Sequence, residues 1–262
     1  MRLASFLATA LLSVPLLTAA GQAHEFLVVP RGDVARDASV TVEAQAAHIF
    51  MQSEEAEKVE NVRVELLTAD GKKTALALAP SAASKALEGT VKGPVAAPAW
   101  LVGHRLPEIW SSTTEGVLYG DRAALEAQGK TVRSVCRYEK FTKTAVVPGG
   151  DAAFWSTPLG QALEIVPQAS LAGLAAGGSL TVQVLLDGKP VPQAEVGLSY
   201  DGYSKEEDTY KQLLHTDAAG KVTLPLDTAG LWLARVAVTR PVKDGKGVDE
   251  DQLRSTLVFP VK

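Results

Sequence analysis

Short stretches in which apolar and polar residues alternate recur along most of the chain. Alternation over residues 39–44 and 62–66 is typical of strands that bury one face. The same pattern returns at residues 180–185, 194–200 and 230–236, and glycine-rich turn segments separate these stretches. The regular alternation of strands with long helices that marks a parallel α/β enzyme is not seen. The pattern therefore predicts an all-β protein.

The predicted strands fall into two groups. Residues 24–166 form the first group, an N-terminal β module. Residues 167–262 contain short strands at a regular turn spacing, which is typical of a β-sandwich of the immunoglobulin or prealbumin type. We therefore expect two antiparallel β-sandwich-like modules in tandem.

Residues 1–23 have the features of a secretory signal peptide. An apolar stretch at residues 3–17 follows a single basic residue, and the small residues Gly21 and Ala23 lie three and one positions before the expected cut. The apolar stretch is too short to span a bilayer comfortably. We expect the segment to be cleaved and the protein to be exported, to a bacterial periplasm.

Cleavage after Ala23 would make His24 the first residue of the mature chain. A cut after Ala20 would leave His24 inside the chain, so the position of the cut matters for its chemistry. No later stretch is long enough to cross a membrane, and we expect no membrane span in the mature chain.

The net charge, the single cysteine and the lack of known catalytic motifs exclude several classes of function. A net charge of −4 over 262 residues argues against nucleic acid as a main partner. The lone Cys136 excludes a disulfide within the chain. There is no nucleophile elbow, glycine-rich phosphate loop or zinc-protease motif. We therefore expect a protein without enzymatic activity.

The four histidines are the main candidates for chemistry. His24 opens the first strand and His48 follows the second, so antiparallel pairing would bring them together. His104 follows the short apolar strand 100–102 and could join them, whereas His215 lies at a turn of the second module and is the least expected ligand. The acid-rich stretch at residues 53–60 is expected to be a solvated loop.

A terminal histidine can chelate a metal ion through its amine and its ring Nδ1. Cu(II), Ni(II) and Co(II) all favour nitrogen donors. The sequence therefore predicts a transition-metal site formed by His24 and His48, with His104 as a candidate third ligand.

An alternative function needs no metal. Trp100, Trp110, Trp155 and Trp232 could form a face that binds sugars, but the apolar strand contexts of Trp155 and Trp232 favour packing in the core. On this interpretation the chain is a non-catalytic carbohydrate- or protein-binding β-sandwich module, and its histidines are incidental.

Several motifs, in order along the chain, resemble the periplasmic family of domain of unknown function 4198, which is associated with nickel or cobalt uptake. They are Ala23-His24-Glu25-Phe26, His48-Ile49-Phe50, the stretch from Trp110 to Gly116, Tyr138-Glu139-Lys140-Phe141, Pro158-Leu159-Gly160, Gly188-Lys189-Pro190-Val191, Thr216-Asp217-Ala218-Ala219-Gly220 and Gly230-Leu231-Trp232-Leu233.

The resemblance implies a metal-handling accessory protein without catalysis. It favours Ni(II) or Co(II) as the bound ion and suggests a membrane metal-uptake component as partner. By affinity order alone, Cu(II) would suit the nitrogen donors at least as well.

Overall fold

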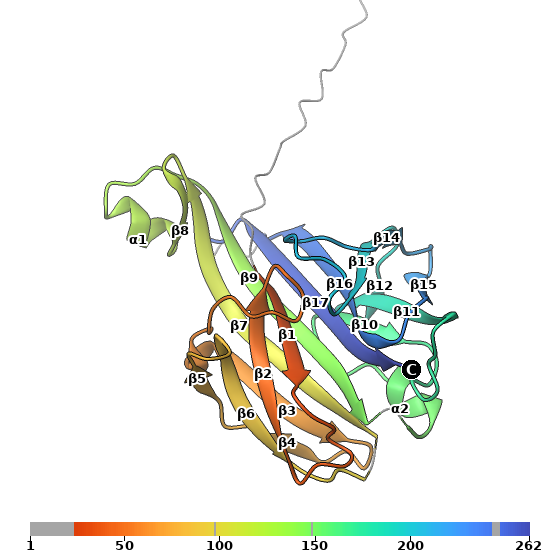
Figure 1. The fold of residues 1–262 in the computed structure, drawn as a ribbon. Coiled ribbons are helices and arrows are strands. Elements are labelled where there is room, and N and C mark those ends of the chain that lie inside the picture. The colour runs from red at the N-terminus through yellow and green to blue at the C-terminus, as the bar shows by residue number, and fades with distance from the viewer. Residues whose placement is uncertain (1–23, 97, 148, 243–246) are drawn as a thin grey trace, which may run out of the picture.

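A computed structural model describes residues 24–96, 98–147, 149–242 and 247–262 (Figure 1). Residues 1–23, where the signal peptide is predicted, lie outside the described residues. The fold is mostly β, with 54% strand and 6% helix, which confirms the all-β prediction.

The elements of the first part are β1 (Glu25–Pro30), β2 (Ser39–Ala47), a 3-10 turn (Val59–Asn61), β3 (Val62–Thr68), β4 (Lys73–Ala75), β5 (Ala79–Ser81), β6 (Ala86–Lys92), β7 (Ala99–Thr113), β8 (Gly116–Tyr119), α1 (Arg122–Glu126), β9 (Val132–Val147) and α2 (Ala152–Ser156). Those of the second part are β10 (Leu163–Pro167), β11 (Gly178–Leu186), β12 (Lys189–Pro190), β13 (Glu195–Tyr200), β14 (Gln212–His215), β15 (Lys221–Leu226), β16 (Gly230–Pro241) and β17 (Glu250–Val261).

A nine-stranded sheet forms the middle layer of the molecule. Its strand order is β14-β13-β16-β17-β9-β7-β3-β4, and β8 pairs with β7. Strands from both sides of residue 166 are hydrogen-bonded into this one sheet. They meet where β17 runs parallel to β9, from the pair Glu250–Cys136 to the pair Val258–Thr144.

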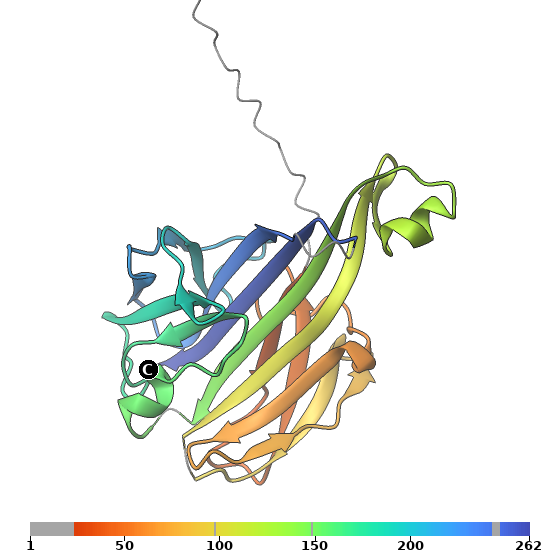
Figure 2. The ribbon, with the colours of Figure 1, turned by 180° about the vertical axis from the view of Figure 1, so that it is seen from behind.

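Two smaller sheets cover opposite faces of the nine-stranded sheet. The sheet β1-β2-β6-β5 lies on one face (Figure 1), and β10, β11, β12 and β15 form the layer on the other (Figure 2). Successive residues of β16 face the two smaller sheets in turn. Leu233 packs with Leu27 of β1, whereas its neighbours Trp232 and Ala234 pack with Ile165 of β10.

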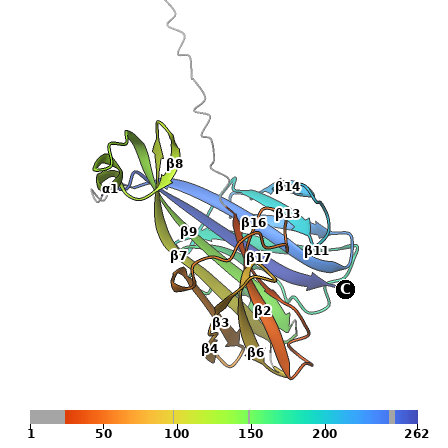
Figure 3. The ribbon, with the colours of Figure 1, turned by 60° about the vertical axis from the view of Figure 1, so that its left-hand side comes forward.

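The long strands β7 and β9 extend beyond the body of the molecule. With β8 and α1 they form a projecting arm, which we define as residues 108–138 (Figures 1 and 3). Leu125, Val132 and Val135 of the arm pack with Val248 in a small core of their own. The apolar strand expected at residues 100–102 is thus only the beginning of one 15-residue strand.

The two α-helices among the described residues have five residues each. Within the described part of the chain, no helix is long and apolar enough to cross a membrane.

Candidate metal centre

His24 and His48 face each other at one end of the β1–β2 pair. The two strands are antiparallel, and their outermost pair is Glu25 with Ala47. Each histidine is the next residue outward from that pair, so antiparallel geometry places them opposite one another. Their ring centroids lie 4.2 Å apart. The expected meeting of these two histidines is therefore present.

Glu54 reaches the same point because the chain turns back after β2. The turn contains Met51 in the left-handed region, with φ of 66°, and returns so that the Glu54 N–H donates to the Ala46 carbonyl at 2.9 Å. Ala46 also forms an isolated bridge with Glu55. Residues 53–60 are a largely exposed connection, as expected, but these contacts hold its beginning against β2.

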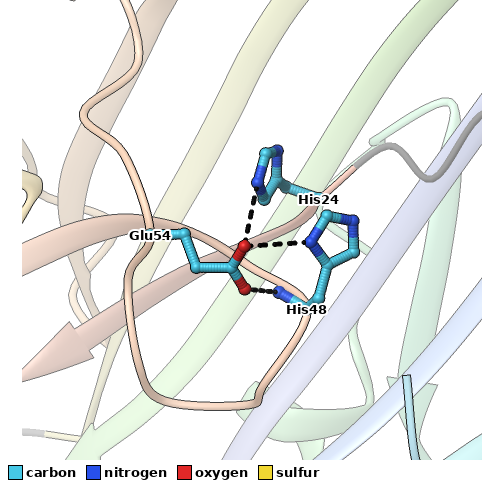
Figure 4. Close-up of side chains that lie close together, drawn as sticks. All are labelled: His24, His48 and Glu54. Carbon is cyan, nitrogen blue, oxygen red and sulfur yellow. Dashed lines mark hydrogen bonds and ion pairs between the residues drawn. The ribbon is translucent and has the colours of Figure 1, made fainter. Parts of the chain in front are cut away.

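The carboxylate of Glu54 lies between the two histidines (Figure 4). Its Oε2 is 3.1 Å from His48 Nδ1 and 3.3 Å from His24 Nε2. Its Oε1 accepts the backbone N–H of His48 at 2.7 Å and, more weakly, that of Ile49 at 3.4 Å. The backbone of one histidine thus orients the carboxylate toward both rings.

The spacing of these donors suits a metal ion. Two ligand atoms about 2.1 Å from one ion, and about 90–110° apart around it, lie about 3.0–3.4 Å from each other. The distances from Glu54 Oε2 to the two ring nitrogens fall in this range. One ligand atom from each of the three residues lies within 4.8 Å of the others. Small movements would therefore let the set close around one ion.

Hydrogen bonding keeps Glu54 ionised. Partial burial acts to raise the pKa of its carboxyl, but the backbone N–H of His48, the His48 ring and the Ile49 N–H outweigh burial and lower the pKa to about 2. A metal ion would therefore meet a carboxylate that has no proton to displace near neutral pH. Competition with protons falls on the imidazoles instead.

The His24 side of the cluster opens to solvent. The His24 side chain is 25% exposed and that of His48 is 9% exposed. The Nδ1 of His24 faces Glu55 Oε1 at 3.4 Å, on the side away from Glu54. A chelate through the terminal amine and Nδ1 would use this outer side, whereas Nε2 faces the cluster.

Side chains of the large sheet fix the position of β1. As the edge strand of its own sheet, β1 turns every second carbonyl away from β2. Lys140 Nζ donates to the His24 carbonyl at 2.7 Å, Thr256 to the Phe26 carbonyl at 2.8 Å, and Thr144 to the Val28 carbonyl. His24 is therefore held by its backbone as well as by its ring.

Glu25, the residue after His24, is anchored in the interior. Its side chain is fully buried, and its Oε1 accepts from Arg235 Nε at 2.8 Å and from Arg254 Nη1 at 2.7 Å. A buried carboxylate between two guanidinium groups has its charge compensated. These ion pairs tie the start of the described chain to β16 and β17.

The structure does not bring His104, the expected third ligand, to this cluster. Gly103 packs against Phe26 and Val28 of β1, so alternation along β7 turns His104 to the opposite face of the large sheet. There its Nε2 is 2.7 Å from Glu139 Oε1, and its ring stacks on Phe141 with a centroid distance of 4.9 Å. Glu54 takes the third place in the cluster.

The other residues that the sequence singles out as candidates for chemistry or binding do not belong to this cluster. His215 ends β14, opposite Glu195. Trp100, Trp155 and Trp232 are fully buried, and Trp110 alone of the four tryptophans lies partly exposed, on the arm, so the four do not share a sugar-binding face. Burial raises the pKa of the Cys136 thiol to about 11, which keeps it protonated near neutral pH.

The likeness to solved structures is weak. The D0–D1 domain of intimin is 15% identical, with 91% of this chain and 99% of that chain covered and a TM-score of 0.22. The FN1–FN3 domains of chicken CNTN1 are 8% identical, covering 91% of this chain and 66% of that chain at a TM-score of 0.22. TM-scores this low carry no information about function.

Comparison of the sequence with protein families gives a clearer result than the solved structures. No curated protein matches it. The family described as Domain of unknown function (DUF4198) matches residues 21–240, which include β1, β2, the His24–His48–Glu54 cluster and most of the large sheet. The chain therefore belongs to the DUF4198 family, as its motifs predict.

Proposed function

We propose that the protein is an exported, periplasmic accessory protein that binds a transition metal ion at His24, His48 and Glu54. It serves the uptake or handling of nickel or cobalt, with copper as the other candidate cargo, and it catalyses no reaction. A membrane metal-uptake component would be its partner.

The observation that carries this proposal is the shared carboxylate of Glu54. Its Oε2 lies at ligand–ligand spacing from a ring nitrogen of each histidine. Two imidazoles and a carboxylate form a set that late first-row metals accept, since imidazole suits nickel, copper, iron and zinc. A free amine on His24 would chelate Ni(II), Co(II) or Cu(II) together with Nδ1, on the outer side of the ring, and is therefore an alternative to coordination through Nε2.

The exposure of the site supports handling rather than permanent storage. Structural metal sites are closed, with every position filled by protein ligands. Here three side chains leave positions open on the exposed His24 side. A bound ion could therefore pass to or from another carrier by ligand exchange.

The test is titration of Ni(II), Co(II) and Cu(II) into the exported protein, His48→Ala and a variant with one glycine added before His24. The proposal expects one site per chain. His48→Ala should weaken binding at least about tenfold, because even outer partners of metal ligands contribute about 10–100-fold. Failure of all three metals to bind would contradict the proposal. An unchanged affinity in the glycine variant would exclude only the terminal chelate.

The second candidate is a carbohydrate-binding module without a metal. It is favoured by the Trp110–Tyr119 pair, which lies partly exposed beside the site, with ring centroids 5.5 Å apart. Binding of neutral glycans without metal would support it.

A further inference from the structure

A cavity of about 650 Å³ adjoins the metal centre. It lies between the stretch that follows Glu54 and the base of the arm. Its lining includes His24, Glu55, Trp110 and Tyr119, together with the buried Arg105 and Lys140. Because His24 belongs to both, a ligand in this cavity would be next to an ion at the metal centre.

The aromatic wall is a corner rather than a flat platform. The rings of Trp110 and Tyr119 meet at 80°. Tyr119 is 58% exposed, and Lys58 Nζ lies 5.1 Å from its ring centroid. Stacking on an extended sugar chain needs an open, flat ring face, whereas a corner suits a small compact molecule.

The buried part of the lining includes an ammonium group, that of Lys140, with N–H donors that are still available. Arg105 is occupied by Glu57 and Glu108. Lys140 donates to the His24 carbonyl at 2.7 Å, and its Nζ lies 3.9 Å from Glu57 Oε1, beyond hydrogen-bond distance. An ammonium carries three N–H donors. Lys140 can therefore donate to an anionic group that enters the cavity.

Lys140 is buried, with 5% of its surface exposed. A buried ammonium needs an opposite charge close to it, and a carboxylate in the cavity would supply one.

We propose that this cavity binds a small carboxylate chelator, which coordinates the metal at His24 from the open side while one of its carboxylates reaches Lys140. The cargo is then a metal–carboxylate complex rather than the bare ion. This inference rests on the proposed metal centre and adds the class of the co-ligand. It requires no bond to be made or broken beyond ligand exchange at the metal.

The experiment measures retention of radiolabelled citrate by the exported protein in equilibrium dialysis, with and without one equivalent of Ni(II). The variant is Tyr119→Ala, which changes the cavity wall and leaves the metal ligands intact. The matched control is Tyr203→Ala, because Tyr203 is also exposed and also lies under a lysine, with Lys211 Nζ 5.7 Å from its ring centroid.

We expect nickel and citrate to be retained together, one of each per chain, by the wild type and by Tyr203→Ala. Tyr119→Ala should weaken citrate retention by roughly tenfold, the equivalent of one aromatic contact, while its affinity for Ni(II) alone is unchanged. Circular dichroism checks that both variants are folded.

Four results would overturn the inference. If citrate strips nickel from the protein, or if the nickel-loaded protein retains no citrate, the inference fails and the metal centre stands. If nickel does not bind at all, the proposed function fails and the inference with it. Retention of a neutral oligosaccharide without metal would reassign the cavity to the carbohydrate alternative.

Discussion

Glu54 joins two segments of the chain at the level of single atoms. One carboxylate oxygen accepts backbone N–H groups from His48 and Ile49, which directly follow β2, and the other faces the rings of His24 and His48. A carboxylate that is hydrogen-bonded in this way is oriented before any ion arrives. Preorganised ligands bind metals more tightly than mobile ones.

Substitution of Glu54 should therefore weaken metal binding. Glu54→Gln keeps the size of the side chain and removes its charge, and we expect the affinity for Ni(II) to fall by about 10–100-fold. Competition with a colorimetric chelator measures the change. Glu60→Gln is the matched control, since Glu60 is an exposed glutamate in the same connection, and its affinity should equal that of the wild type. Equal affinities in both variants would exclude Glu54 as a ligand.

Glu54 also predicts how stability of the metal-free protein depends on pH. The pKa of its carboxyl is about 2 in the folded chain against an ordinary value of 4.5, so below pH 4.5 the unfolded chain binds the proton more readily. The contribution of Glu54 is complete above pH 4.5 and is lost as pH falls toward 2.

Urea unfolding at pH values between 6 and 2 tests this dependence, with the range set by the pKa of Glu54. The difference in unfolding free energy between the wild type and Glu54→Gln should shrink steadily below pH 4.5. A difference that stays constant over this range would show that the carboxylate has no favoured ionised state in the fold.

Two of the three cluster residues were predictable from the sequence. Histidines are few here, and antiparallel pairing of two alternating stretches places His24 opposite His48. Glu54 was not predictable, because four acids in one short connection look alike and the turn at Met51 selects among them. The sequence predicted that the strand at residues 100–102 ends before His104. Alternation along the strand therefore could not be used to find which side of the sheet His104 faces.

At the scale of elements, β1 is the strand that positions the site. It pairs with β2 on one side and receives side-chain hydrogen bonds from β9 and β17 on the other. Its close approach to the large sheet depends on Gly103 of β7. A Cβ at Gly103 would lie 2.5 Å from Thr142 Cγ2, 2.7 Å from Val28 Cγ2 and 2.9 Å from Phe26 Cε1.

A side chain at Gly103 should displace β1. We expect Gly103→Ala to lower the free energy of unfolding by about 1–3 kcal/mol, as overpacking of a tight interior does. The shift of β1 should also weaken Ni(II) binding. Gly149→Ala is the control, because nothing lies within 4 Å of its Cβ position. Unfolding in urea compares the two, and equal stabilities would mean that β1 does not pack tightly at this glycine.

The alternating stretches predicted most of the strands but not their full lengths. β7 runs for 15 residues through Gly103, Pro107 and a register shift against β9 between Arg105 and Glu108. Glycine and proline interrupt the sequence signal of a strand. Pairing with β9 along the arm overrides that signal, which explains why the sequence predicted shorter pieces.

At the scale of the whole molecule, the large sheet is continuous across the expected boundary at residue 166. Residue 166 lies inside β10, which pairs with β11. The parallel pairing of β17 with β9 then joins the two halves. Pairing between strands more than a hundred residues apart leaves no local pattern in the sequence, so alternation alone predicted tandem modules without this connection.

Continuity of the sheet predicts cooperative unfolding. The halves share a nine-residue parallel ladder and the buried ion pairs of Glu25 with Arg235 and Arg254. We expect one thermal transition whose calorimetric and van't Hoff enthalpies agree. Differential scanning calorimetry of the metal-free protein measures both. Two separate transitions would instead indicate halves that fold independently.

The central claim is that His24, His48 and Glu54 together hold one metal ion. Anomalous diffraction at the nickel edge, from crystals of the protein loaded with Ni(II), tests it most directly. The account predicts one strong peak about 2.0–2.2 Å from a ring nitrogen of each histidine and from a carboxylate oxygen of Glu54. A peak bound by other residues, or no peak in crystals at full nickel loading, would contradict it.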